Sequence, residues 1–121
     1  MKIENIYFET LDTTIPFYIG KNAKDNFHII DLCEPDDLWF HVHGQSSCHV
    51  IALIASIKDL EKNEIQEIIE RGSLLCKENT FKVASLHNIK IEYTFLNNIQ
   101  KTKTVGCVLF RDPGKVKKIV C

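Results

Sequence analysis

A chain of 121 residues in which 45% are hydrophobic is long enough to form one domain with its own core. Its 15 basic and 16 acidic side chains give a formal net charge of −1, which excludes a global preference for nucleic acid or for an acidic membrane surface. Any argument from charge must therefore be local.

The five cysteines and the termini bear on the compartment. The cysteine number is odd and no two cysteines have the C-x-x-C spacing, so free thiols in a reducing compartment are the simpler interpretation. The N-terminus has no apolar secretory segment, and no run approaches the ~20 apolar residues of a membrane span. We therefore expect a cytoplasmic protein that does not enter a membrane.

The chain begins with two short β-rich runs. Residues 2–10 alternate in polarity, residues 15–19 form a second apolar run, and a polar turn lies between them, which predicts an N-terminal hairpin. The sequence GKNAKDN follows at 20–26. Asn22 is a suitable N-cap for a short helix near 22–33. Gly20 permits a close backbone approach, and Lys21 and Lys24 add positive charge at a helix N-terminus, where anions are favoured.

The stretch DDLWFHVHGQSSCHV, at 36–50, contains the only tryptophan and three of the five histidines. Its apolar residues alternate with Trp39, His41 and His43, so one strand face should be apolar and the other should carry an aromatic and two imidazoles. Residues 44–47 are typical of a turn, and 49–53 form a second strand. We expect a hairpin with His41, His43 and His49 near its turn.

The second half contains one amphipathic helix followed by strands. Asn63 is a candidate N-cap, with Gln66 completing a capping box, and apolar residues recur at helical spacing over about 63–79. Strands are predicted at 90–95, 106–111 and 116–120, with the last two joined as a hairpin by the turn at 112–115. This order predicts a single α+β domain over 1–121, with a mostly antiparallel sheet and the main helix packed on one face.

Charge is unevenly distributed along the chain. From residue 101 onward six side chains are basic and one is acidic, whereas acidic residues outnumber basic ones over 59–78. The basic residues are Lys101, Lys103, Arg111, Lys115, Lys117 and Lys118. A basic side of this kind is compatible with binding a phosphate backbone. The alternative is a solvated lysine edge that prevents strand-to-strand aggregation.

The three central histidines have alternative interpretations. The His-x-His spacing resembles the metal-ligand motif of cupins, so a small cupin-like metal-binding protein or enzyme using His41, His43 and His49 is the alternative function. That motif also needs a nearby glutamate, and no acid occurs between Asp37 and Asp59. Cys48 and Ser47 adjoin a histidine in sequence, which does not make a triad. We therefore expect no metal, no cofactor and no enzyme. The histidines either satisfy backbone groups near the turn or form a polar recognition surface, with Trp39 packed or stacked on a base.

Several motifs in order resemble the NFACT-R domain, the RNA-binding module of the NFACT ribosome-quality-control family. Gly20-Lys21-Asn22 with Asn26 resembles its opening signature, and 37–42, DLWFHV, resembles its Asp-x-Trp-x-His-x core. Residues 46–50, SSCHV, stand where most members have Pro-Gly-Ser-His-Val. Tyr93-Thr94 resembles its late strand, Lys101 and Lys103 resemble its basic loop, and Gly106 resembles its glycine. The Ser-Ser form is similar to the short eukaryotic coiled-coil proteins that carry this domain.

The resemblance implies a non-catalytic nucleic-acid-binding module linked to translation or ribosome-associated quality control. RNA is the expected partner, as tRNA or ribosomal RNA, with attachment to the ribosome as an extension and DNA as the alternative ligand. The tail-elongation activity of the larger family members needs domains that this sequence lacks, so it is not implied. The predicted nucleic-acid-binding residues are Lys21, Asn22, Lys24, Trp39, His41, Ser46, Ser47, His49, Lys101, Lys103 and Arg111.

Overall fold

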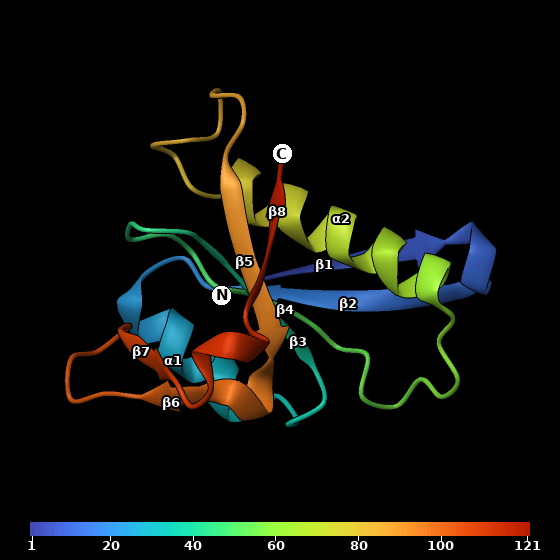
Figure 1. Ribbon diagram of the computed structural model, residues 1–121, viewed down its shortest axis with the longest axis horizontal. Coiled ribbons are helices and arrows are strands. Elements are labelled where there is room, and N and C mark those ends of the chain that lie inside the picture. Colours follow the sequence, from blue (N-terminus) through green and yellow to red (C-terminus); the bar gives the residue numbers. More distant parts are fainter.

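The computed structural model describes residues 1–121 and has the α+β architecture that the sequence predicts (Figure 1). A six-stranded sheet has the order β1–β2–β4–β3–β5–β8, and all of its neighbouring strands are antiparallel. Its strands are β1 (Lys2–Phe8), β2 (Thr13–Ile19), β3 (Leu38–Val42), β4 (Val50–Ala52), β5 (Lys90–Phe95) and β8 (Lys117–Val120). The predicted N-terminal hairpin and the predicted central strand pair are both confirmed. No helix has the length and apolar character that crossing a membrane requires.

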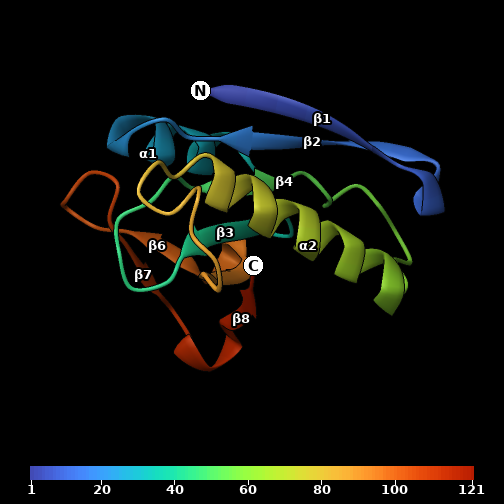
Figure 2. The ribbon, with the colours of Figure 1, turned by 90° about the horizontal axis from the view of Figure 1, so that it is seen from above.

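Helix α2 (Lys62–Glu78) covers one face of the sheet, against β3, β4 and β5 (Figures 1 and 2). Gly72 lets the helix approach closely, because a Cβ there would lie 2.3 Å from Cζ of Phe40. The predicted cap is wrong. Glu61 is the N-cap, and its backbone N–H donates to Oε1 of Glu64 at 2.8 Å. Two carboxylates at the positive end of the helix therefore form the capping box.

The opposite face of the sheet is covered by α1 (Ala23–Leu32) and by a separate hairpin of β6 (Ile99–Lys101) and β7 (Val108–Phe110) (Figure 1). The short helix predicted near 22–33, with Asn22 as its N-cap, is confirmed. A smaller core fills this side, formed by Ile29, Trp39, Ile51, Leu96 and Ile99. The hairpin turn packs on the first turn of α1, since a Cβ on Gly106 would lie 2.6 Å from Cβ of Ala23.

The predicted C-terminal hairpin of 106–111 with 116–120 is wrong. β7 pairs with β6, and β8 instead pairs with β5 at the edge of the main sheet. Asn98 explains the change of direction: its Oδ1 accepts from the backbone N–H of Asp112 at 2.7 Å, and its Nδ2 donates to the Asp112 carbonyl at 3.0 Å. A short 3-10 turn at Pro113–Lys115 then leads the chain to the other sheet.

Candidate nucleic-acid interface

An open groove of about 750 Å³ lies where four segments meet on the α1 side of the molecule. These segments are the start of α1 (residues 21–23), the β3–β4 turn with the residues after it (44–49), the loop that follows α2 (79–82), and the β6–β7 turn (105–108). Trp39, His41, Glu92 and Phe110 also line it. Four segments remote in sequence thus form one concave surface.

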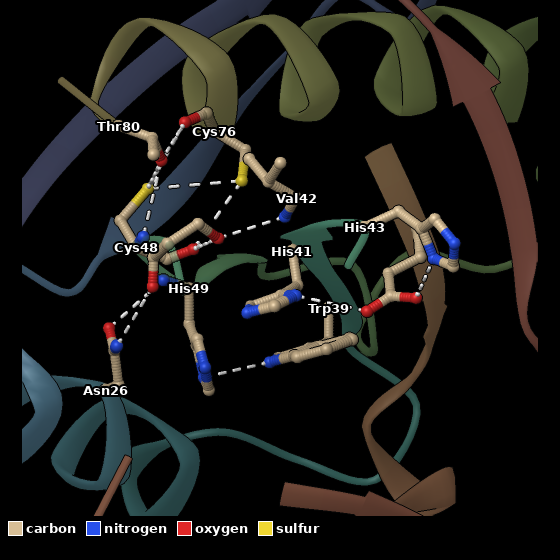
Figure 3. A network of polar contacts seen from close by, with 11 residues as sticks. Asn26, Trp39, His41, Val42, His43, Cys48, His49, Cys76 and Thr80 are labelled. Carbon is tan, nitrogen blue, oxygen red and sulfur yellow. Dashed lines mark hydrogen bonds and ion pairs between the residues drawn. The ribbon is translucent and has the colours of Figure 1, made fainter. Parts of the chain in front are cut away.

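The rings of Trp39, His41 and His49 line this groove and pack against one another (Figure 3). The Trp39 ring stacks on His41 with centroids 5.5 Å apart and an interplanar angle of 6°, and it meets His49 edge-on at 5.2 Å. Trp39 is 0% exposed, so of the two roles considered for it, packing is the one the structure shows, and stacking on a base is excluded. The prediction that β3 separates an apolar face from a Trp/His face is confirmed.

His49 is a neutral side chain that lines the groove. The Trp39 indole N–H donates to its Nδ1 at 3.2 Å, so the single ring proton is on Nε2. Burial, and then the charge of nearby His41, lower the pKa of His49 to about 3. Nε2 of His49 has no hydrogen-bond partner in the protein. The only fully buried side-chain polar atom without a partner is Ser73 Oγ, so Nε2 of His49 is not fully buried, and its residue lines the groove. Of His41 and His49, a recognition surface requires one to be partly exposed: His49 is 1% exposed, and His41 is the half-buried one.

Glu92 on β5 holds the other two histidines. Its Oε1 lies 3.1 Å from Nδ1 of His41 and its Oε2 lies 3.1 Å from Nδ1 of His43. Burial raises the pKa of Glu92, but the hydrogen bonds from both histidines outweigh it, so the net pKa is lowered and the group is a carboxylate. No acid lies near the histidines in sequence, and Glu92 reaches them only because it is the cross-strand partner of His41.

The three histidines do not converge on a common point. His41 and His43 both turn Nδ1 toward Glu92, and His49 turns Nδ1 toward Trp39 (Figure 3). Nowhere in the chain do three or more His, Cys, Asp or Glu side chains gather in a way that would hold a metal ion. The geometry therefore gives the cupin-like alternative no ligand set.

Gly20 and Asn26 build the backbone support of the groove. Asn26 is buried, its Oδ1 accepts from the His49 backbone N–H at 3.0 Å, and its Nδ2 donates to the Ser47 carbonyl at 3.4 Å. A Cβ on Gly20 would lie 2.0 Å from that Oδ1, so only glycine fits there. The Gly20 and Lys21 amides donate to the His49 carbonyl and to Asp25. Both amides are therefore already used within the protein.

The β3–β4 turn is closed by its own polar groups. Ser47 Oγ accepts from the Val42 N–H at 3.0 Å and donates to the Cys48 carbonyl at 2.8 Å, so its hydroxyl is used within the protein. The Cys48 N–H donates to Thr80 Oγ1 at 3.3 Å, and the Cys48 and Cys76 sulfur atoms lie 4.0 Å apart (Figure 3). These contacts attach the turn to the end of α2. Ser46 is exposed at its tip.

The predicted basic residues fall into two groups. Lys21, Lys24 and Lys103 are exposed, and the packing of Gly106 on Ala23 brings the first turn of α1 and the β6–β7 turn to one end of the groove. Lys101 forms an ion pair with Asp31 and lies 5.0 Å from the centre of the Phe27 ring. Arg111 lies at the other end of the hairpin, with a 3.4 Å contact to Gln100. Asn22 caps α1 through the Asp25 N–H.

Two residues outside the predicted nucleic-acid-binding set also line the groove. Phe81 is 96% exposed, the most exposed large hydrophobic side chain in the molecule, and Lys82 follows it. Both line the groove just past the end of α2. An aromatic next to a lysine in a polar connector was the sequence signal that could have identified them.

Comparison with known families decides the classification. Residues 5–117 match the family described as the NFACT protein RNA binding domain. The chain belongs to this family. As a member of the NFACT RNA-binding domain family it is a nucleic-acid-binding module, and the resemblance drawn from the motifs is confirmed.

Relatives agree with this classification. The chain is 30% identical to Coiled-coil domain-containing protein 25 of Danio rerio, over 92% of this chain and 55% of the relative. It is 31% identical to the protein of that name in Mus musculus (87% and 51%) and to its Dictyostelium discoideum homolog (94% and 56%). The chain thus spans about half the length of the curated relatives it matches.

A solved structure shares the fold. The C-terminal part of the fibronectin/fibrinogen-binding protein from Streptococcus suis superimposes with a TM-score of 0.76, at 19% identity, over 99% of this chain and 45% of that one. At this identity the likeness establishes the architecture alone.

Proposed function

We propose that this chain binds structured RNA, tRNA or ribosomal RNA, through the groove and the three exposed lysines at its α1 end. The module is non-catalytic and acts in the cytoplasm, in translation or ribosome-associated quality control, with the ribosome as the larger partner. DNA is the competing ligand. The observation that carries the proposal is the contact between the first turn of α1, which follows Lys21 and contains Lys24, and the β6–β7 turn, which contains Lys103, in a chain of an RNA-binding family.

Electrostatics supports this surface despite the net charge of −1. The acid that lines the groove, Glu92, is held between two histidines, and Lys21 and Lys82 also line it. The amides of Ala23 and Lys24 have no partner within the protein and lie in the first turn of α1. Exposed lysines with such amides are suited to phosphate groups.

The contacts of the polar side chains support a non-catalytic role. The Ser47 hydroxyl is bonded to backbone, and the Cys48 thiol contacts Cys76 and Thr80. Neither has a histidine base within hydrogen-bond reach, which nucleophilic catalysis needs. His41 is bonded to Glu92 and stacked on Trp39, an arrangement that fixes its ring in place.

The test is the salt dependence of tRNA binding, measured by fluorescence anisotropy. Each phosphate contact contributes a slope of roughly −0.7 to −0.9 to log K against log salt. We expect the double variant Lys24→Ala, Lys103→Ala to bind more weakly and to lose about two contacts' worth of slope. Lys58→Ala, an exposed lysine outside α1 and the β6–β7 turn, is the matched control.

An unchanged slope in the double variant would exclude this end of the groove as the phosphate site. For the translational setting, the wild-type chain should co-sediment with ribosomes at low salt and the double variant should not. Tighter binding to duplex DNA than to tRNA at equal salt would favour DNA as the ligand instead.

A further inference from the structure

The side chain of His49, a residue that lines the groove, has one hydrogen-bond donor without a partner in the protein. His49 is 1% exposed, and its Nδ1 is occupied by the Trp39 N–H, so its Nε2–H is fixed as a donor that no group of the protein accepts. A donor that the protein leaves unpaired at the wall of a groove is met by water or by an acceptor of a ligand. The arrangement points to an acceptor supplied by a ligand.

An exposed aromatic ring lines the same groove as that donor. The hydrogen bond from the Cys48 N–H to Thr80 Oγ1, at 3.3 Å, joins the two segments, and His49 and Phe81 are each the next residue in the chain. Phe81 is 96% exposed and makes no aromatic contact in the protein. A free ring face, a fixed donor and Lys82 therefore line one groove, on two segments that this hydrogen bond joins.

These three groups match the chemistry of one unpaired nucleotide. Aromatic side chains stack on bases that are free of a duplex, donors bind the acceptor atoms on the edges of such bases, and lysine meets the phosphate. In a double helix each base is stacked on its neighbours, so no base face is free to stack on the Phe81 ring. A fully paired RNA can reach only the lysines.

We propose that the groove holds an unpaired RNA nucleotide, with its base stacked on Phe81 and an acceptor of the base or ribose bonded to Nε2–H of His49. This inference rests on the proposed RNA-binding function and adds its ligand class. The exposed lysines at the α1 end bind the backbone of paired or unpaired RNA alike. Only the contact with Phe81 distinguishes unpaired RNA from paired RNA.

The experiment compares a single-stranded RNA decamer of mixed sequence with the same strand annealed to its complement, at equal salt. Wild-type protein should bind the single strand about tenfold more tightly, as expected for one stacked base. Phe81→Ala should remove this difference and leave the duplex affinity unchanged. Phe81→Trp should restore it. Phe95→Ala is the control, because Phe95 is 42% exposed and does not line the groove.

Trp39 supplies a second readout, since it is the only tryptophan and lines the groove. Its emission should change on adding the single strand to wild-type protein and should change less in Phe81→Ala. Equal affinity for single strand and duplex, or equal loss of both in Phe81→Ala, would overturn the nucleotide site while leaving RNA binding intact. Wild-type protein that binds neither RNA at low salt would overturn the proposed function as well.

Discussion

The indole N–H of Trp39 donates to Nδ1 of His49 at 3.2 Å, across the hairpin of β3 and β4. Both side chains are buried, and each ring also contacts His41. The bond fixes the neutral tautomer of His49 and therefore decides which ring nitrogen faces the groove. A structural contact in the core thus sets the hydrogen-bonding character of the candidate site.

Removing the acceptor of this bond should destabilise the fold. We expect His49→Phe to lower the free energy of unfolding by about 1–3 kcal/mol, because the Trp39 N–H would be buried without a partner. Urea denaturation followed by Trp39 emission measures this directly. His87→Phe, in an exposed loop, is the matched control and should change stability by less than ~0.5 kcal/mol. A His49→Phe variant as stable as wild type would show that the bond contributes nothing.

The low pKa of His49 predicts how stability depends on pH. Its pKa is about 3 in the folded protein and 6.5 ordinarily, so below pH 6.5 the unfolded chain takes up a proton that the folded protein does not. Stability should therefore be complete above pH 6.5 and decline as the pH falls toward 3. Between pH 7.5 and pH 5 the His49 contribution amounts to about 2 kcal/mol.

The His49→Phe variant isolates this contribution. The variant has no group to protonate at position 49. The difference in unfolding free energy between wild type and variant should therefore become about 2 kcal/mol smaller when the pH is lowered from 7.5 to 5. A gap that stays constant over this range would mean that His49 is as easily protonated in the folded state as in the unfolded chain.

Gly20 and Asn26 should behave as a coupled pair. Gly20→Ala places a Cβ 2.0 Å from Asn26 Oδ1, so the amide must move and release the His49 N–H and the Ser47 carbonyl. We expect a loss of about 1–3 kcal/mol. In an Asn26→Ala background the obstacle is gone, and the same substitution should cost at least ~1 kcal/mol less. Additive losses in this double-mutant cycle would show that the two residues act independently.

The sequence predicts most of the fold because local signals agree with it. Alternation in 38–43 predicted the two faces of β3, and Asn22 predicted the start of α1. The motif residues are explained by structure: buried Asp37 accepts from the Glu34 and Ala55 amides, and Gly20 makes room for Asn26. Periodicity does not determine which strands pair. For this reason the predicted pairing of 116–120 with 106–111 was wrong, and β8 pairs with β5.

The candidate site was harder to predict because it depends on contacts remote in sequence. Glu92 reaches His41 only through the pairing of β3 with β5, and Lys101 is neutralised by Asp31 on α1. Hydroxyl and amide groups that looked free, those of Ser47 and Asn22, are used to close a turn and cap a helix. The aromatic–lysine pair at 81–82 is a local signal, but the exposure of Phe81 and its place in the groove depend on the tertiary structure.

The central claim is that RNA binds in this groove, and amide chemical-shift mapping by NMR during a titration with tRNA tests it most directly. The account predicts that the largest shifts fall in residues 21–24, 44–49, 80–82 and 103–107, together with the Trp39 indole N–H. It would be contradicted by shifts confined to the lysine-rich pocket on the α2 face, around Lys62, Lys115 and Lys117. It would equally be contradicted by a titration that moves no signal of the groove.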